Sequence, residues 1–206
     1  MMTDEAPRQP IRSDARENRR RLLAAAKELF DAQGSEATSM QEIARVAGVG
    51  QGTLYRHFAD KAAICQALIE ADIAAFQERV GPVLSGGWVL ASPLARLELL
   101  LVEKIRLTES HLPLFAALEH SPPGKRGVKP FQGPFYLWQL EQIVALLSEA
   151  SAQGEVDGID VEFMADAVLA VTSPRLYSHQ HDDLGYSSER VIAGLRRLFI
   201  DAMREA

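Results

Sequence analysis

Hydrogen-bonding side chains gather between residues 51 and 61, after the glycines of a predicted turn. They are Gln51, Thr53, Tyr55, Arg56, His57 and Lys61, and Gly52 lies among them. Gln and Arg can each make two hydrogen bonds to the edge of a purine base, whereas Thr and Tyr suit phosphate or thymine-methyl contacts. A glycine in such a segment lets the backbone come close to a partner. This chemistry is typical of binding to a DNA duplex.

Residues 39–58 are predicted to form the two short helices that would position these side chains. Ser39 and Glu42 have the spacing of a capping box, which opens the first helix. Residues 48–50 (Gly-Val-Gly) break the chain for a tight turn, and the second helix covers 51–58. Two short helices joined in this way form a helix-turn-helix, and the second is of a size to enter a major groove.

Further side chains around this motif are predicted to hold phosphates and so to fix the register on the duplex. Ser39 and Gln41 stand at the start of the first short helix, and Lys61 begins the helix after the second. We expect at least one of six nearby arginines to touch a phosphate, a solvated helix start being the alternative. These are Arg8, Arg12, Arg16, Arg19, Arg20 and Arg21. Phe58 is expected in the core, and a role for His57 as a helix cap stays open.

This segment resembles the DNA-binding domain of the tetracycline-repressor (TetR) family over about residues 16–76. The matching words are Ala26-x-x-Leu29-Phe30-x-x-x-Gly34, Ala37-Thr38-Ser39, Glu42-Ile43-Ala44, Ala47-Gly48-Val49, Gly52-Thr53-Leu54-Tyr55, His57-Phe58 and Asp60-Lys61. The resemblance implies that the exposed face of residues 51–57 meets DNA. One departure is Gly50, where the family often has a capping side chain; the cap is weaker by only a few tenths of a kcal/mol.

Helical periodicity runs through almost the whole chain, and the alternation of a β-strand is nearly absent, which predicts an all-α fold of about nine helices. The expected domains are a three-helix DNA-binding domain at 14–60, a linking helix at 61–80, and an effector-binding and dimerisation domain at 81–206. Gly81-Pro82 is expected to end the linking helix. Pro174 is expected to bend or break a helix that Asp160 caps, because its ring removes a helical hydrogen bond.

Charge is distributed unevenly along the 206 residues, whose formal net charge is -6. Residues 1–61 hold 10 Lys/Arg against 9 Asp/Glu, whereas residues 62–206 hold 12 against 19. Any surface that binds a polyanion is therefore expected near the amino end. The single cysteine, Cys65, excludes an intramolecular disulfide and is expected to be buried. With an acidic start and no apolar stretch long enough to span a bilayer, the chain is expected in the cytoplasm, without a membrane role.

Aromatic and histidine side chains beyond residue 110 are candidates to line an effector pocket between helices. We single out His111, Phe115, Phe135, Trp138 and Tyr177 from a larger group that adds His120, Phe131, Tyr136, His179 and His181. Taken together they favour a bulky, largely apolar small-molecule effector, with ordinary core packing as the alternative for each residue. The run from His179 to Asp183 has metal-ligand chemistry, but a solvated polar loop is favoured, and no metal or other cofactor is expected.

The resemblance also implies a two-fold dimer in which the last two long helices pair with their mates, so that two half-sites about 34 Å apart are bound. The apolar residues concerned are Phe163, Met164, Ala167, Val168 and Val171, and Val191, Leu195, Leu198, Phe199 and Met203. The predicted function is a ligand-responsive repressor that binds a palindromic operator. An adaptor or small-molecule-binding protein without DNA binding stays open, and an enzyme is disfavoured because no phosphate-binding glycine loop or nucleophile elbow occurs.

Overall fold

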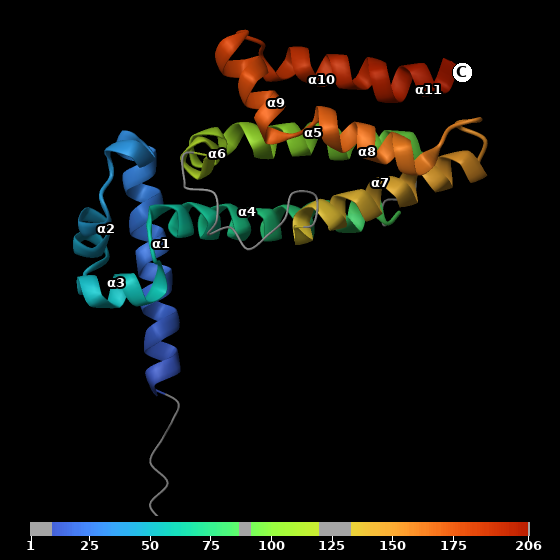
Figure 1. Ribbon diagram of the computed structural model, residues 1–206. Helices are drawn as coiled ribbons and strands as arrows, with labels where there is room; N and C mark the ends of the chain where they lie inside the picture. Colours follow the sequence, from blue (N-terminus) through green and yellow to red (C-terminus); the bar gives the residue numbers. More distant parts are fainter. Residues whose placement is uncertain (1–9, 87–91, 120–132, 206) are drawn as a thin grey trace, which may run out of the picture. The chain divides into compact units, whose positions relative to one another are not determined.

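The computed structural model describes residues 10–86, 92–119 and 133–205, and these contain helices and turns but no strand (Figure 1). The amino-terminal helices are α1 (Pro10–Ala37), α2 (Met40–Ala47), α3 (Gln51–His57) and α4 (Lys61–Leu84). They are followed by α5 (Pro93–Ser110), α6 (Leu112–Glu119), α7 (Pro134–Ala152), α8 (Val161–Val171), α9 (Pro174–Ser178), α10 (Ser188–Arg196) and α11 (Ala202–Glu205). Two π-helical turns, η1 (His179–Asp183) and η2 (Arg197–Asp201), continue α9 and α10. The all-α prediction is confirmed.

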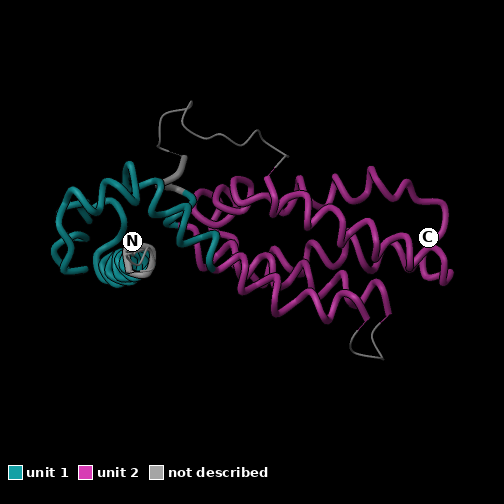
Figure 2. The backbone as a smooth tube through the Cα atoms, turned by 90° about the horizontal axis from the view of Figure 1, so that it is seen from below, with its two compact units in different colours: residues 1–71, 113–121 teal, residues 72–112, 122–206 magenta. Residues whose placement is uncertain are grey.

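The chain divides into two compact units, coloured separately in Figure 2. Unit 1 comprises residues 1–71 and 113–121, and unit 2 comprises residues 72–112 and 122–206. The division falls inside α4, whereas the predicted functional domains are separated by that helix. The proline- and glycine-rich stretch from Ser121 to Gly133 is predicted to be the longest loop, and its residues 121–132 lie outside the described residues, as do Arg8 and His120.

Unit 1 is built around the apolar faces of α1, α2 and α3. The buried residues of this core are Leu22, Ala25, Ala26, Phe30, Ile43, Ala44, Ala47, Leu54, Phe58, Ile64, Cys65 and Ala67. Ala44 and Ala47 are small, which allows α2 to pack closely against its neighbours. Phe58 is 3% exposed and Cys65 is fully buried, so both predictions of core residues are confirmed. Burial also raises the pKa of the Cys65 thiol.

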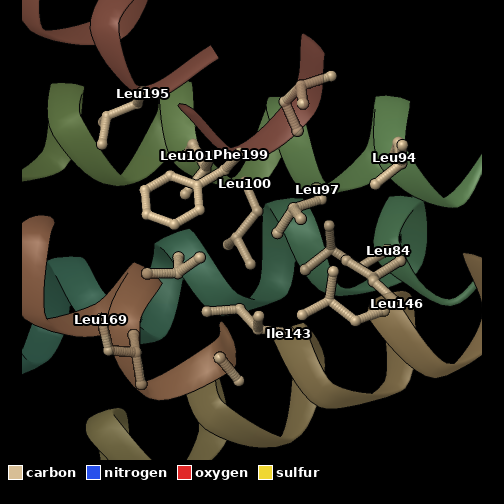
Figure 3. Close-up of a cluster of buried hydrophobic side chains, with 14 of the residues drawn as sticks. Leu84, Leu94, Leu97, Leu100, Leu101, Ile143, Leu146, Leu169, Leu195 and Phe199 are labelled. Carbon is tan, nitrogen blue, oxygen red and sulfur yellow. The ribbon is translucent and has the colours of Figure 1, made fainter. Parts of the chain in front are cut away.

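Unit 2 is a helical bundle in which α7 packs against α5 and α8, and α10 packs against α5. Figure 3 shows its leucine-rich centre, with Leu84, Leu94, Leu97, Leu100, Leu101, Ile143, Leu146, Leu169, Leu195 and Phe199 pointing toward one another. Burying one such side chain stabilises the fold by about 2 kcal/mol relative to leaving it in water. No helix within the described ranges combines the length and apolar character that crossing a bilayer needs.

Pro174 starts a new helix, as the sequence predicts for a residue that cannot continue the previous one. Helix α8 ends at Val171, and the Ser173 side chain accepts a hydrogen bond from Leu176 N to cap α9. Asp160 caps the start of α8 by accepting from Phe163 N at 3.0 Å. The starts of α8 and α9 depend on hydrogen bonds between residues close in sequence, so such helix boundaries can be predicted from the sequence.

Helix α4 does not end at Gly81-Pro82, so that prediction is wrong. The helix continues to Leu84 with Pro82 inside its last turn. Near a helix end the ring removes one hydrogen bond only, and Ser85 N still donates to Gly81 O at 3.0 Å. Arg96 Nη1 donates to Leu84 O at 2.8 Å, which satisfies a carbonyl that the helix itself leaves without a partner. This tertiary hydrogen bond therefore stabilises the end of α4 beyond Pro82.

Candidate nucleic-acid interface

Helix α3 presents a polar outer face because its single buried side chain, Leu54, faces the core of unit 1. Gly50 opens the helix in extended geometry and makes no side-chain cap, as the sequence predicts. Gln51, Gly52, Tyr55 and Arg56 are exposed, and Thr53 and His57 are half-buried. Tyr55 is 52% exposed, although large aromatic side chains are usually buried. All the predicted residues of this helix therefore share one accessible segment.

Arg56 is held along α3 by a hydrogen bond from its Nη2 to Thr53 Oγ1, at 3.1 Å. This bond uses one of the five N–H donors of the guanidinium, and the side chain stays exposed. The contact orients the planar group without burying it. Such an arrangement suits a guanidinium that makes two hydrogen bonds to a base edge.

The start of α2 has the predicted capping box. Ser39 Oγ accepts from Glu42 N at 3.2 Å, and Glu42 Oε2 accepts from both Ser39 N and Ser39 Oγ at 2.9 Å. These hydrogen bonds, that from the Ser39 backbone first, lower the pKa of Glu42. The Ser39 hydroxyl proton is thus already donated within the chain, whereas the neighbouring Gln41 side chain is exposed.

Lys61 connects the start of α4 to the last turn of α1 and to Thr38, which precedes α2. Its Nζ donates to the backbone carbonyls of Ser35, Glu36 (3.2 Å) and Thr38 (3.1 Å). An ammonium group has three N–H donors, and here each has a backbone partner. The structure thus shows an internal role for Lys61, and its contact with a phosphate stays a prediction.

Two arginines of α1 make contacts to the helix-turn-helix segment. The Arg19 guanidinium lies 5.2 Å from the centre of the Phe58 ring, and Arg21 Nη2 donates to Gly48 O at 3.3 Å. Gly48 has a φ of 63°, in the left-handed region that favours glycine. Arg20 instead pairs with Glu17 at 2.8 Å, on the exposed surface. Contact between these arginines and a phosphate remains a prediction.

The predicted effector-site residues do not all belong to one unit. Phe115 lies in unit 1, whereas His111, Phe135, Trp138 and Tyr177 lie in unit 2. Tyr177 is 1% exposed within the core of unit 2, and burial, with the nearby Glu109 carboxylate second, raises the pKa of its hydroxyl. Tyr177 is therefore packed as an ordinary core residue, which was the alternative to a role in an effector pocket.

Phe135 and Trp138 form an aromatic cluster with Phe76 of α4, which the sequence analysis missed. The rings of Phe135 and Trp138 are stacked with centroids 6.0 Å apart, and Phe76 meets Phe135 edge-on at 5.8 Å and Trp138 at 6.0 Å. Phe135 and Trp138 are half-buried, whereas Phe76 is 1% exposed. Such edge-to-face contacts add about 1 kcal/mol to the burial of the rings.

The buried face of α5 carries a polar stripe formed by Lys104, Thr108 and His111. His111 Nε2 lies 2.7 Å from Asp72 Oδ2, and its Nδ1 lies 2.8 Å from Leu107 O. Of the stripe, only His111 was a predicted site residue. The signal for the others was their spacing, since positions four and seven residues apart share one helix face, next to the core residues Leu101 and Ile105.

The run from His179 to Asp183 forms the π-helical turn η1, so the predicted loop is wrong in conformation. His179 Nδ1 lies 2.6 Å from Asp183 Oδ2, and His181 Nδ1 lies 2.8 Å from Asp182 Oδ1. Each imidazole is therefore paired with one carboxylate. In the part of the chain that the structure describes, no group of three or more His, Cys, Asp or Glu side chains is arranged to hold a metal ion.

Known proteins resemble both the helix-turn-helix segment and the whole chain. Residues 22–68 match the family model of bacterial regulatory proteins of the tetR family. An HTH-type transcriptional regulator of Staphylococcus aureus (strain MRSA252) is 29% identical over 191 residues, which cover 93% of this chain and 97% of that protein.

Solved structures of transcriptional regulators share the fold of this chain over most of their length. A transcriptional regulator of the TetR/AcrR family from Thermobifida fusca YX-ER1 superposes with a TM-score of 0.70 and 23% identity, covering 89% of this chain and 96% of that one. The transcriptional regulator FadR from Bacillus subtilis, solved in complex with stearoyl-CoA, superposes with a TM-score of 0.65 and 20% identity. The match covers 88% of this chain and 97% of that one. The family consists of regulators and not of enzymes, and its motif coincides with the polar helix described above. The helix-turn-helix segment of this chain therefore matches the tetR family of bacterial regulatory proteins, and the chain as a whole is similar to helix-turn-helix transcriptional regulators.

Proposed function

We propose that this regulator is a ligand-responsive repressor that binds a palindromic operator as a homodimer. The observation that carries the proposal is the exposed polar face of α3, where Gln51, Tyr55 and Arg56 surround a helix anchored by the buried Leu54. Gln51 and Arg56 would contact purine edges in the major groove, and Thr53 and Tyr55 would contact phosphate or a thymine methyl group.

Phosphate contacts around α3 would fix its register on the duplex. Gln41 at the start of α2 is proposed to contact one strand, together with His57 and the exposed Arg16. A contact of Ser39 with the same strand would require its hydroxyl to exchange the hydrogen bond to Glu42 for one to a phosphate. Gly52 has open space where a Cβ would lie, so the backbone of α3 can come close to DNA. Lys61 would support this surface from within, by holding the turn that precedes α2.

A second copy of the chain would supply the other half-site, because one short helix neutralises few phosphates. Phe163 of α8 is 71% exposed and Leu198 of η2 is 64% exposed, which is unusual for large apolar side chains. We propose that these two residues lie in the dimer contact. Their predicted companions Val168, Val191, Leu195, Phe199 and Met203 are buried in the core of unit 2 and would support the contact from beneath.

The proposed effector would bind in unit 2, beside the aromatic cluster of Phe76, Phe135 and Trp138. The fold shared with a regulator solved with stearoyl-CoA supports this placement of a ligand with a large apolar part. Ligand binding would tilt α4 and change the separation of the two α3 helices in the dimer. A coupling free energy of about 1 to 3 kcal/mol would release the operator.

Selection of random DNA duplexes by the purified protein tests the proposal. We expect a palindromic consensus whose halves are centred one helical turn apart, or a multiple of it, because a two-fold dimer reads the same bases twice. A selected sequence without two-fold symmetry would contradict the dimer. Equal affinity for every duplex and for heparin would contradict sequence-specific regulation.

A further inference from the structure

Lys104 is a buried cation in the interior of unit 2. It lies on α5, and its residue is 7% exposed. Below it on the same helix face, Thr108 Oγ1 donates to Lys104 O at 3.0 Å, which places a second polar group in this stripe. Buried lysines are rare unless they are paired with an anion or serve a function.

The ammonium of Lys104 has a neutral partner, the side-chain oxygen Oε1 of Gln139. Gln139 is itself 4% exposed and is oriented by a hydrogen bond from its Nε2 to Phe135 O, at 3.1 Å. One of the three N–H donors of the ammonium is thereby used. Among the described residues, no carboxylate forms an ion pair with Lys104.

Two other buried basic residues of the same unit each have a carboxylate partner. Arg96, 5% exposed, pairs with Glu149, and His111, 7% exposed, pairs with Asp72. Lys104 differs from both because no carboxylate within the described ranges pairs with its charge. Burial lowers the pKa of Lys104 from 10.5 to about 8, so the protonated form still predominates at neutral pH. An uncompensated charge in a core destabilises the fold, so its presence points to an anion that arrives from outside.

The apolar groups next to Lys104 indicate the rest of that anion. Gln139 lies one residue beyond Trp138 on α7, and its Nε2 reaches the Phe135 backbone. Trp138 and Phe135 are stacked on each other and closed by Phe76. A single cation beside an aromatic cluster suits an amphipathic molecule with one negative charge. A phosphate dianion would leave one buried negative charge without a partner, so a carboxylate fits better.

We infer that Lys104 recognises the carboxylate of an amphipathic effector whose apolar part packs against Phe76, Phe135 and Trp138. This inference rests on the proposed ligand-responsive function and names the chemical class of the ligand. It replaces the largely apolar effector expected from the sequence with one that carries an acid group.

Isothermal titration calorimetry of the full chain with decanoate, decan-1-ol and decyl phosphate tests the inference. We expect decanoate to bind at least ~30-fold more tightly than decan-1-ol, since losing one partner of a buried charge pair costs that much or more. Lys104→Met keeps a similar volume without the charge and should bind decanoate no better than decan-1-ol. Lys27→Met is the matched control, since Lys27 is an exposed lysine of α1 and should leave both affinities unchanged.

The comparison of acid and alcohol in the unaltered protein needs no variant to fold. Equal affinities for decanoate and decan-1-ol, or unchanged decanoate binding by Lys104→Met, would overturn the inference. Tighter binding of decyl phosphate than of decanoate would overturn the assignment to a singly charged ligand. Operator binding, measured separately, distinguishes the two proposals. If decanoate binds through Lys104 without changing operator affinity, ligand-responsive repression fails while the carboxylate site stands.

Discussion

The Nζ atom of Lys61 donates a hydrogen bond to the backbone carbonyl of Thr38, at 3.1 Å, across 23 positions of sequence. This contact joins the first residue of α4 to the turn before α2. The same ammonium also donates to the carbonyls of Ser35 and Glu36. Lys61 thus holds together two ends of the helix-turn-helix domain that only folding brings close.

Lys61→Met is expected to lower the free energy of unfolding by about 1 to 3 kcal/mol, because carbonyls in a partly buried turn lose their donor. Denaturant unfolding of the purified protein measures this loss. Lys27→Met, on the exposed surface of α1, should change stability by less than about 0.5 kcal/mol. A different result would favour contact between Lys61 and a DNA phosphate. In that case Lys61→Met would leave stability unchanged, and the slope of DNA affinity against salt concentration would fall by about the amount expected for one lost phosphate contact.

Arg56→Ala is expected to weaken binding to the selected operator by about 1 to 3 kcal/mol and to relax base preference at one position of each half-site. The physical reason is the loss of a guanidinium that Thr53 orients on an exposed helix face. Competition binding with operator variants measures both effects. Arg175→Ala removes an exposed arginine of α9 in unit 2 and serves as the control. Equal losses for the two variants would argue against base contact by Arg56.

Leu198→Glu is expected to shift the protein from dimer to monomer, with a dissociation constant raised at least ~30-fold. A carboxylate at the proposed contact would be buried without a partner, whereas the isolated chain leaves this position 64% exposed. Sedimentation equilibrium gives the constant. Leu137→Glu, at a position 50% exposed on α7, provides the matched control. A dimer that tolerates Leu198→Glu as well as Leu137→Glu would place the contact elsewhere.

The stability of the protein is expected to depend on pH through Lys104. The pKa of this side chain is about 8 in the folded chain and 10.5 in its ordinary state, so the unfolded chain binds more protons between these values. Unfolding free energy therefore rises with pH in this window, and the cost of burying the charge is fully present below about pH 8. Relative to Lys104→Met, the wild-type chain should gain about 2 kcal/mol between pH 7 and pH 10.

Urea unfolding of the two proteins at matched pH values measures this gap. The difference between the unfolding free energies of the wild-type chain and Lys104→Met removes the contribution of the other titrating groups, which both proteins share. A constant difference in stability across the range would show that Lys104 does not carry a buried charge.

The two glycines of the turn between α2 and α3 should respond oppositely to substitution. Gly48→Ala is expected to destabilise the fold by about 1 to 2 kcal/mol, because a Cβ is unfavourable in left-handed backbone. That Cβ would also lie 2.6 Å from Arg21 Nη2. Gly50→Ser should stabilise α3 by a few tenths of a kcal/mol, since the position is extended, open and without a side-chain cap. Thermal unfolding of both variants checks the signs, and equal effects would contradict this account of the turn.

Local hydrogen bonding made the helix-turn-helix predictable from the residues alone. Ser39 and Glu42 are three positions apart, so their capping box depends only on the geometry of one helical turn. The same holds for Asp160, whose side chain accepts a hydrogen bond from the first turn of the helix that it opens. The polar face of α3 follows from the 3.6-residue period, because Leu54 is its single buried side chain.

The tertiary structure decided which side chains meet across the sequence and which stay exposed. Lys104 and Gln139 are 35 positions apart, and no local pattern pairs them. Periodicity placed Phe163 and Val168 together on an apolar stripe, yet packing buries Val168 and leaves Phe163 exposed. Hydrogen bonds within a turn are fixed by backbone geometry, whereas long-range contacts depend on how whole helices pack. For that reason the sequence determined the helix-turn-helix segment and the all-α fold, and only the folded chain revealed Lys104 as a buried cation with no carboxylate partner among the described residues.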